Sequence, residues 1–515
     1  MEFRVLITNL LGPFKYEVFF IFIFFFIPVV FALMIFSEKI ERIFFFLINF
    51  LTSRAPTFEN ISLTQNVEYF KGTIWSHNIH IGDILSLVFL FLVIVKKEFR
   101  KYFKLIPEGT IPLFLYGFCS SLSVINSSEF TIERSFYAMS LFFRQFVFFY
   151  CLANYLRVPG RREFQLKSFF FVALYSAIIG IQQRYLLGLQ RVAADFAHPN
   201  SLVFYLVPVM VIFTPILFNA KDNGYNRKIG ITAVLSALVP CLLTISRGFL
   251  VHFAVGIVAV IVLDFLLKFN LKKPLIIVSF VLGMLLFSVK AWDTWADRFE
   301  FGSNPAGTAQ RKAYYLIGYA VLKSKMWFGI GINQFGTNAY QIEILNEVLE
   351  YDRVKNDKGI KDFVQSTKNG VKRRIKKNLP VKKLFGGGNP ESFYVMHFAE
   401  TGLVGIFGTM FCQIFFILSA LRSVIYFRRR NIFLYSLSVG LVGAQLGIYT
   451  QSIFEYILRQ ENPMYLQGIL FAMVSSVAAE RRSKRFHHID LSKNKQLEVL
   501  DADADEPPPL PTFNS

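Results

Sequence analysis

Long runs of apolar residues without a single charge constrain this chain more than any other sequence feature. One of them, Phe19 to Phe26, consists only of phenylalanine and isoleucine. Phenylalanine occurs 61 times in the 515 residues, and 54% of the chain is hydrophobic. A helix that is apolar on every side is stable only where water is absent. Because a bilayer also forces backbone amides to bond within the protein, the sequence predicts an all-α, polytopic membrane protein.

The apolar runs are long enough to cross a bilayer about a dozen times, since a spanning helix needs roughly 20 mostly apolar residues. No small-residue cleavage site follows the first run, so it is interpreted as a retained span and not a signal peptide. The shorter run Ile43 to Leu51 is interpreted as lying at the membrane interface. The predicted spans are 18–36, 81–95, 109–125, 137–156, 166–183, 201–218, 229–246, 249–267, 274–291, 402–421, 432–454 and 464–479.

Lysine and arginine are concentrated in every second loop. Basic loops stay on the cytoplasmic side of a membrane, so this alternation orients the spans. It predicts that both termini are cytoplasmic and that the long segments 37–80 and 292–401 are external. The basic clusters are Lys96–Lys104, Arg157–Lys167, Lys221–Lys228, Lys268–Lys273, Arg422–Arg430 and Arg481–Arg485.

This pattern divides the chain into four parts. Residues 1–291 carry spans one to nine, 292–401 form a large external loop subdomain, and 402–485 carry spans ten to twelve. Residues 486–515 are acidic and proline-rich, which predicts a disordered cytoplasmic tail or a motif for a partner. Within the loop, the basic run Lys368 to Lys383 is either a solvated helix face or a contact for lipid headgroups.

The net charge of +20 does not indicate a nucleic-acid partner. The basic residues are scattered at span ends, where topology and anionic lipid explain them, and no soluble fold is available to present a groove-reading element. No CxxC or Cys/His cluster indicates a metal site. The cysteines all fall inside apolar stretches and are interpreted as small core residues: Cys119, Cys151, Cys241 and Cys412.

Arg247 is the most informative polar residue, because it lies in a very tight connection between two apolar spans. A guanidinium held there stays charged and costs several kcal/mol to bury unless it meets an anion. Its planar set of donors suits a pair of phosphate oxygens. The alternative is an arginine that extends to the interface or pairs with a local acid.

Other polar residues lie at the predicted outer ends of the spans. Arg191, His198 and Asn200 precede or open span six, and Arg311 lies in an amphipathic helix of the external loop, Ala309 to Lys325. As alternatives, Arg311 is an ordinary surface residue and His198 a helix-start residue.

Further candidates lie where the external loop leads into span ten. Glu391 stands at a helix start, where a carboxylate with a raised pKa can take a proton from a hydroxyl. The alternative is a carboxylate stabilised by the helix dipole. Tyr394 and Glu400 follow on the same helix, and Glu400 is alternatively a local cap or ion-pair partner. Arg144, within span four, is interpreted as a structural ion-pair or headgroup partner.

Short motifs between about residues 187 and 410, under half of the chain, carry a family resemblance. They are Ala197-His198-Pro199-Asn200, Thr244-Ile245-Ser246-Arg247-Gly248, Gln310-Arg311 leading to Trp327-Phe328-Gly329-Ile330-Gly331, and Glu391 through Tyr394 to Glu400-Thr401-Gly402. In this order and topology they resemble the O-antigen ligase and O-antigen polymerase superfamily. That family has multiple spans, a large external loop near the C-terminal third, and essential arginines on the external face.

One departure from the family pattern bears on the type of enzyme. Ligases of this family usually carry a His-Asn pair at the place that Glu391-Ser392 occupies here, counting back from Glu400. His397 lies on the same helix but at the wrong position. The Glu-Ser pair is similar to polymerase-type members and favours a polymerase over a ligase.

The resemblance implies glycosyl transfer from a polyprenyl-diphosphate-linked glycan at the periplasmic face of a bacterial inner membrane. The enzyme would polymerise O-antigen or exopolysaccharide repeat units, inverting the anomeric centre, with no metal and no nucleotide or other cofactor. Arg247, Arg311 and Arg191 would hold the pyrophosphate, and Glu391 would act as base. Substrate binding would fall to His198, Asn200, Tyr394 and Glu400. Membrane lipids, a flippase and a chain-length regulator are the candidate partners.

Three alternatives stay open. An O-antigen ligase would move the glycan to lipid A-core or another acceptor. A polysaccharide or lipid-linked glycan transporter fits the predicted span number, although transporters more often show broken helices at the bilayer midplane and related halves. A membrane scaffold or sensor would act through the cytoplasmic tail.

Overall fold

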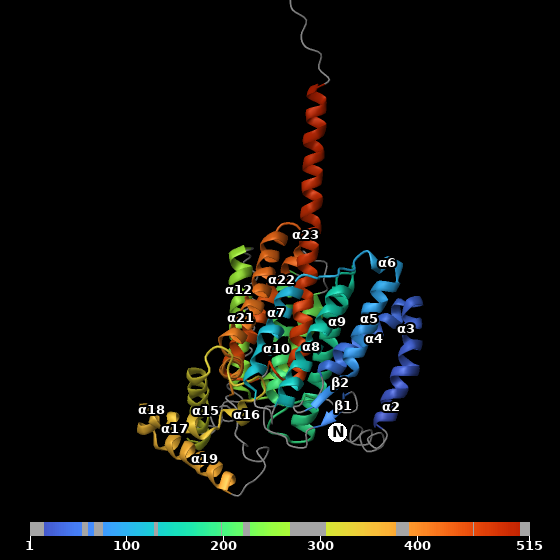
Figure 1. Ribbon diagram of the computed structural model, residues 1–515. Coiled ribbons are helices and arrows are strands. Elements are labelled where there is room, and N and C mark those ends of the chain that lie inside the picture. Colours follow the sequence, from blue (N-terminus) through green and yellow to red (C-terminus); the bar gives the residue numbers. More distant parts are fainter. Residues whose placement is uncertain are drawn as a thin grey trace, which may run out of the picture.

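A computed structural model of the protein describes residues 15–53, 60–65, 76–127, 132–196, 198–219, 227–267, 305–376, 391–456 and 458–504. Helices make up nearly all of this part of the chain, and most of them stand side by side in one bundle (Figure 1). The exception is a two-stranded antiparallel sheet of β1 (Asn60–Gln65) and β2 (Ser76–His80). The expectation of an all-α fold did not include this hairpin.

Every predicted span except 274–291, which lies outside the described residues, falls on a helix. Six helices are long and apolar enough to cross a membrane by length and composition, which indicates a multi-pass membrane protein. The bundle helices are α5 (Ile81–Val95), α7 (Thr110–Ser121) with η2 (Leu122–Asn126), α8 (Ile132–Tyr155), α9 (Arg161–Ile181) with η3 (Gln182–Leu186), α10 (Pro199–Phe218), α11 (Arg227–Leu243), α12 (Arg247–Leu267), α21 (Phe393–Phe427), α22 (Ile432–Phe454) and α23 (Glu461–Ala504).

The interfacial interpretation of Ile43 to Leu51 is wrong. This run lies within α4 (Glu38–Ser53), which is packed inside the bundle against α5 and α9 and buries Phe45 and Ile48. The run looked too short because polar residues interrupt it. These are bonded within the protein: Asn49 donates to the Phe45 carbonyl at 3.1 Å, and its Oδ1 accepts from Gln165 at 2.6 Å. A polar side chain satisfied in this way can be buried at little cost.

The start of α4 lies among the basic loops and not on the external side. Arg161 pairs with Glu38 at 3.1 Å and with Glu41 at 2.8 Å, and Lys96 lies 3.6 Å from Glu41. We call this end of the bundle, which also carries Arg428–Arg430, the basic end, and the opposite end, which carries β1 and β2, the hairpin end (Figure 1). The helix α4 therefore runs from the basic end to the hairpin end, and only the second part of segment 37–80 lies at the hairpin end.

This additional helix also overturns the expectation that both termini share a side. The first rod, α2 (Lys15–Ile21), η1 (Phe22–Phe26) and α3 (Ile27–Phe36), starts beside β1 at the hairpin end and rises to the basic end. The last helix, α23, starts at the hairpin end and extends far beyond the basic end (Figure 1). The two described ends of the chain thus lie on opposite sides of the bundle.

The helix α23 continues to Ala504, through a stretch that the sequence analysis assigned to a disordered tail from residue 486. Residues 486–504 contain Leu, Lys, Glu, Gln and Ala but no proline or glycine. These residues have high helix propensity, and the proline-rich part begins only at Pro507. The acidic character of the tail is therefore compatible with a helix over its first part.

The centre of the bundle is formed by α10 and α22, which are buried on nearly all sides and pack against each other and α12. Small residues allow this approach: a side chain at Gly443 would meet the Gly256 carbonyl at 2.7 Å. Charges inside the bundle are paired. Arg144 binds Asp83 at 2.8 Å and Glu461 at 2.6 Å, which confirms its interpretation as a structural ion-pair partner.

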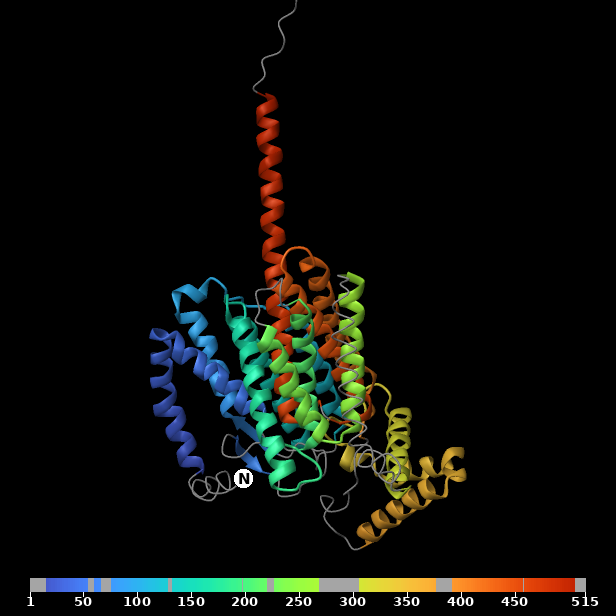
Figure 2. The ribbon, with the colours of Figure 1, turned by 180° about the vertical axis from the view of Figure 1, so that it is seen from behind.

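A small subdomain projects from the hairpin end (Figure 2). It consists of α15 (Pro305–Ser324), α16 (Phe335–Asn338), α17 (Ile342–Glu350), α18 (Asp352–Asn356) and α19 (Lys358–Lys376). These helices share a hydrophobic core of their own, which includes Ile317, Leu345 and Val364. The basic run from Lys368 begins on α19, where Lys372 and Arg373 are exposed, and its remainder lies outside the described residues. The subdomain contacts the bundle through α15 and α21.

The position of α4 predicts the sidedness of single cysteines in a variant without the native ones. Lys39→Cys, in the first turn of α4, should react with a membrane-impermeant maleimide from the same side as Arg429→Cys, because both lie at the basic end. Thr64→Cys on β1 should react only from the opposite side. Labelling of positions 39 and 64 from one common side would contradict this arrangement.

Candidate functional site

A strained turn joins α11 to α12 at the hairpin end. Ile245 has a φ of +51°, which a β-branched residue rarely adopts. Next to it, the Arg191 Nε donates to the Thr244 carbonyl at 3.3 Å, and the Val192 amide donates to the Leu243 carbonyl at 3.4 Å. Strained backbone is found disproportionately at functional sites, because the surroundings must hold it in place. Here the surroundings are the segment that carries Arg191.

Two helix N-termini lie side by side at this turn. His198 caps α10, accepting at Nδ1 from the Asn200 amide at 3.1 Å, and Ser246 donates to the Asn200 Oδ1 at 3.0 Å. Arg247 is the first residue of α12; its side chain and all of Ala197 lie outside the described residues. The helix dipole makes each such N-terminus favourable for an anion, whereas the first amides of α10 already donate to His198: Asn200 to its Nδ1, and Ser201 and Leu202 to its carbonyl. The pair of N-termini therefore forms a polarised surface beside Arg191.

A partly buried carboxylate, which the sequence analysis did not single out, lies against the same turn. Glu455 follows the last residue of α22, and an added side chain at Gly248 would meet its Oε1 at 2.4 Å. Gln451 donates to the Glu455 Oε2 at 2.8 Å, and the His252 Nδ1 lies 2.6 Å from the Gln451 Oε1. Only glycine at 248 leaves room for this carboxylate, which gives the Ser-Arg-Gly motif a physical reason.

The charges around Glu455 come from three separate parts of the chain. The pKa of Glu455 is raised to a net value of about 7, mainly by burial and in part by the negative charge of Glu391. The hydrogen bond from Gln451 and the positive charges of Arg191 and Arg311 act in the opposite direction and lower this pKa. A carboxyl group in this state exchanges its proton near neutral pH.

The external helix α15 brings Arg311 to this cluster. Arg311 pairs with Glu391 at 2.8 Å, with both side chains about half exposed, and the Tyr315 hydroxyl donates to the Ile453 carbonyl at 3.5 Å. Close packing of Gly318 against Val395 fixes α15 beside α21. The structure thus brings Arg191, Arg311 and Glu391 together around Glu455. We call these four residues the charged cluster.

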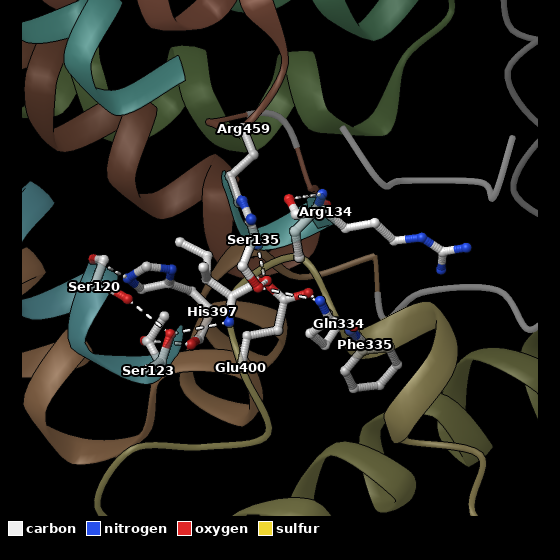
Figure 3. Close-up of polar contacts among 12 residues, drawn as sticks. Ser120, Ser123, Arg134, Ser135, Gln334, Phe335, His397, Glu400 and Arg459 are labelled. Atoms are coloured by element: carbon white, nitrogen blue, oxygen red, sulfur yellow. Dashed lines mark hydrogen bonds and ion pairs between the residues drawn. The ribbon is translucent and has the colours of Figure 1, made fainter. Parts of the chain in front are cut away.

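Glu400 lies apart from the charged cluster, in a buried ion pair (Figure 3). One of its oxygens accepts from Arg459, and the other accepts from the Phe335 amide at 2.9 Å. Its carboxylate is fully buried, and Gly329 packs directly on its backbone. This arrangement favours the structural alternative for Glu400, in which it ties the external loop to the turn between α22 and α23.

Tyr394 also faces the bundle. The chain reverses within α21 at Gly402, whose φ is +66°, so the short arm before it packs against the long arm after it. Tyr394 donates to Gln413 on the long arm at 3.1 Å, and the His397 Nε2 lies 2.9 Å from the Thr409 Oγ1. Figure 3 shows His397 directed toward Ser120 of α7. These contacts position Glu391 at the free end of the short arm.

Glu455 is the site residue that the sequence analysis missed. An acid directly after an uncharged span, on the predicted outer side, was the available signal for it. The sequence also gives no sign of the pairing of Glu400 with Arg459, because the two residues are 59 positions apart. In the described residues, no group of three or more His, Cys, Asp or Glu side chains is arranged to hold a metal ion.

Comparisons with known proteins do not assign the chain to a family. No protein-family model matches the chain, and no curated protein matches it significantly. The resemblance to O-antigen ligases and polymerases therefore depends on the short motifs alone.

The buried pair predicts a strong effect of removing one partner. Arg459→Met should lower the free energy of unfolding by about 3–5 kcal/mol, because it leaves the Glu400 charge buried and unpaired. The double variant Glu400→Gln, Arg459→Met should recover most of this loss. Thermal unfolding in detergent measures both, and equal losses in the single and double variants would contradict the pairing.

Proposed function

We propose that the protein is an inverting glycosyltransferase that takes a glycan from a polyprenyl diphosphate and extends a polysaccharide. The observation that carries this proposal is the meeting of Arg191, Arg311 and two helix N-termini around the strained turn before Arg247. Such a surface suits a diphosphate, whose oxygens accept from guanidinium groups and whose charge is favourable at the positive end of a helix dipole.

The same groups support the chemistry of the leaving group. When the bond from the anomeric carbon to the diphosphate breaks, negative charge accumulates on the diphosphate oxygens. Donors that are already in place stabilise this charge without reorganising, which is the largest contribution in many enzymes. The structure of the turn favours such preorganisation, because the Thr244 carbonyl holds Arg191 and an ion pair with Glu391 holds Arg311.

The location of the cluster suits a lipid-linked donor. It lies at the hairpin end, where the apolar surfaces of α11 and α12 expose Leu235 and Val258 along the bundle toward the lipid. A polyprenyl chain would lie in the bilayer along such surfaces while its diphosphate reaches the helix ends. By the distribution of basic residues, the basic end is cytoplasmic and the site faces the periplasm.

The acceptor is a sugar hydroxyl that attacks the anomeric carbon from the side opposite the diphosphate, so the configuration inverts. Its proton must pass to a base, and two carboxylates, Glu391 and Glu455, adjoin the cluster. We propose polymerisation in preference to ligation because Glu391-Ser392 stands where ligases of the resembling family carry His-Asn.

Removal of the cationic groups should abolish transfer. Arg311→Ala and Arg247→Ala should each lower the rate of chain growth by at least about 100-fold, since each removes charge stabilisation from the transition state. Lys312→Ala is the matched control, because Lys312 neighbours Arg311 on α15 but pairs with Asp357 at 3.7 Å. Normal rates in both arginine variants would contradict the assignment.

The assay uses purified protein and polyprenyl-diphosphate-linked oligosaccharide extracted from cells that lack this chain. Longer glycans on the lipid indicate polymerisation, whereas transfer that requires an added acceptor such as lipid A-core indicates ligation. Movement of the unchanged donor across a vesicle membrane would indicate a transporter and would overturn the proposed chemistry.

A further inference from the structure

Glu455 is placed where a proton acceptor for the reaction is needed. Its carboxylate occupies the space that a side chain at residue 248 would fill, one residue after Arg247 and at the N-terminus of α12. The positive charges of Arg191 and Arg311, the two arginines of the charged cluster, also act on this carboxylate and lower its pKa. A group at this position borders the surface on which the diphosphate would be bound.

Glu391 has a different contact, which makes it less suited to this task. Its Oε2 lies 2.8 Å from the Arg311 Nη2, and its side chain is 46% exposed. A carboxylate that holds a guanidinium is engaged as an ion-pair partner, and solvent competes for its remaining lone pairs. This contact orients Arg311 toward the cluster, which is a positioning role.

We infer that Glu455 is the general base that accepts the proton of the acceptor hydroxyl, whereas Glu391 positions Arg311. This inference rests on the proposed glycosyl transfer. The two carboxylates are assigned from their contacts. Glu455 lies beside the N-terminus of α12 and, among the described residues, forms no ion pair with an arginine. Glu391 forms an ion pair with Arg311.

The step balances without any further reactant. The hydroxyl oxygen forms a bond to the anomeric carbon, and the bond from that carbon to the diphosphate oxygen breaks. The electron pair of that bond leaves with the polyprenyl diphosphate, which the arginines hold. The hydroxyl proton passes to the Glu455 carboxylate and from there to water, which restores the base for the next addition.

Groups on the elements around Glu455 raise or lower its pKa, and their net effect suits this role. Burial and Glu391 raise its pKa, while Gln451 on α22, Arg191 before α10 and Arg311 on α15 lower it, to a net value of about 7. His252 on α12 contacts the Gln451 amide and thereby fixes its orientation. A bound diphosphate would neutralise the arginines, so Glu455 would hold a proton more strongly when the donor is present.

The sign of the pH dependence follows from this state. The base acts as a carboxylate, so kcat/KM for the donor, which reports the donor-free enzyme, should rise with pH and level off above about pH 7, and kcat should level off at a higher pH. Loss of the hydrogen bond in Gln451→Leu removes a group that favours the carboxylate. The acidic limb of the rate profile should therefore move to higher pH in that variant, while the carboxylate itself is retained.

The test compares Glu455→Gln with Glu391→Gln in the chain-growth assay between pH 5 and 9. Glu455→Gln should lower kcat by about 100-fold or more, with little change in KM for the donor and no acidic limb in the residual rate. Glu391→Gln should mainly raise KM for the donor and keep the acidic limb. Glu343→Gln, an exposed acid on α17, is the control and should behave as wild type.

Separate outcomes distinguish the inference from the proposed function. If wild type shows no transfer from the lipid-linked oligosaccharide, the proposed function fails. If wild type is active and Glu455→Gln keeps its rate and its acidic limb, or if the limb disappears only in Glu391→Gln, the inference alone is overturned. Binding of undecaprenyl diphosphate to each variant reports whether the site is folded. If Glu455→Gln does not bind undecaprenyl diphosphate, the test depends on Gln451→Leu. An acidic limb that stays at the wild-type pH in Gln451→Leu then overturns the inference.

Discussion

The buried ion pair between Glu400 and Arg459 is the interaction on which the arrangement of the hairpin end depends. It connects three parts that are distant in sequence: the short arm of α21, the turn between α22 and α23, and the external loop, through the Phe335 amide. Close contacts of Gly329 and Gly402 with the facing backbone tighten the same junction. Because α15 docks on this arm, the location of Arg311 follows from a pair that itself lies outside the charged cluster.

The candidate site is built mainly from the ends of helices. The N-termini of α10 and α12 supply the positive ends of their helix dipoles, the C-terminal end of α22 supplies Glu455, and α15 contributes Arg311 from outside the bundle. Helix ends are where a helical membrane protein has unsatisfied backbone groups, and these lie at the level of lipid headgroups. The diphosphate of the proposed lipid-linked donor would reach the same level, which is consistent with the proposed function.

The sequence predicted those parts of the fold that depend on apolar length. The predicted span 81–95 coincides with α5, because its one charge, Asp83, lies in the first turn and the run from Leu87 to Val95 is entirely apolar. The sequence prediction failed for α4, where Glu41 and Asn49 break the apolar pattern and find partners in Arg161 and Gln165 of another helix. One additional helix then reversed the inferred side of the N-terminal region. Hydropathy cannot anticipate a polar residue whose partner is more than a hundred positions away.

For the site, the sequence predicted residue types more successfully than partnerships. Arg191, Arg311 and Glu391 were singled out by their places at span ends, and the structure brings them together. The roles of Glu400 and Glu455 depended on tertiary contacts with Arg459 and Gly248. A carboxylate at a helix end has the same appearance in sequence whether it forms a buried ion pair or faces a cluster of charges.

The composition of α4 has a consequence for the biogenesis of the protein. Glu41 and Asn49 are unfavourable in lipid when the helix emerges alone, and their partners on α9 are synthesised much later. The N-terminal rod and α4 must therefore wait at the translocon or the membrane surface until Arg161 and Gln165 arrive. Insertion of this helix is coupled to assembly, and errors in α9 should appear as inverted topology of the first part of the chain.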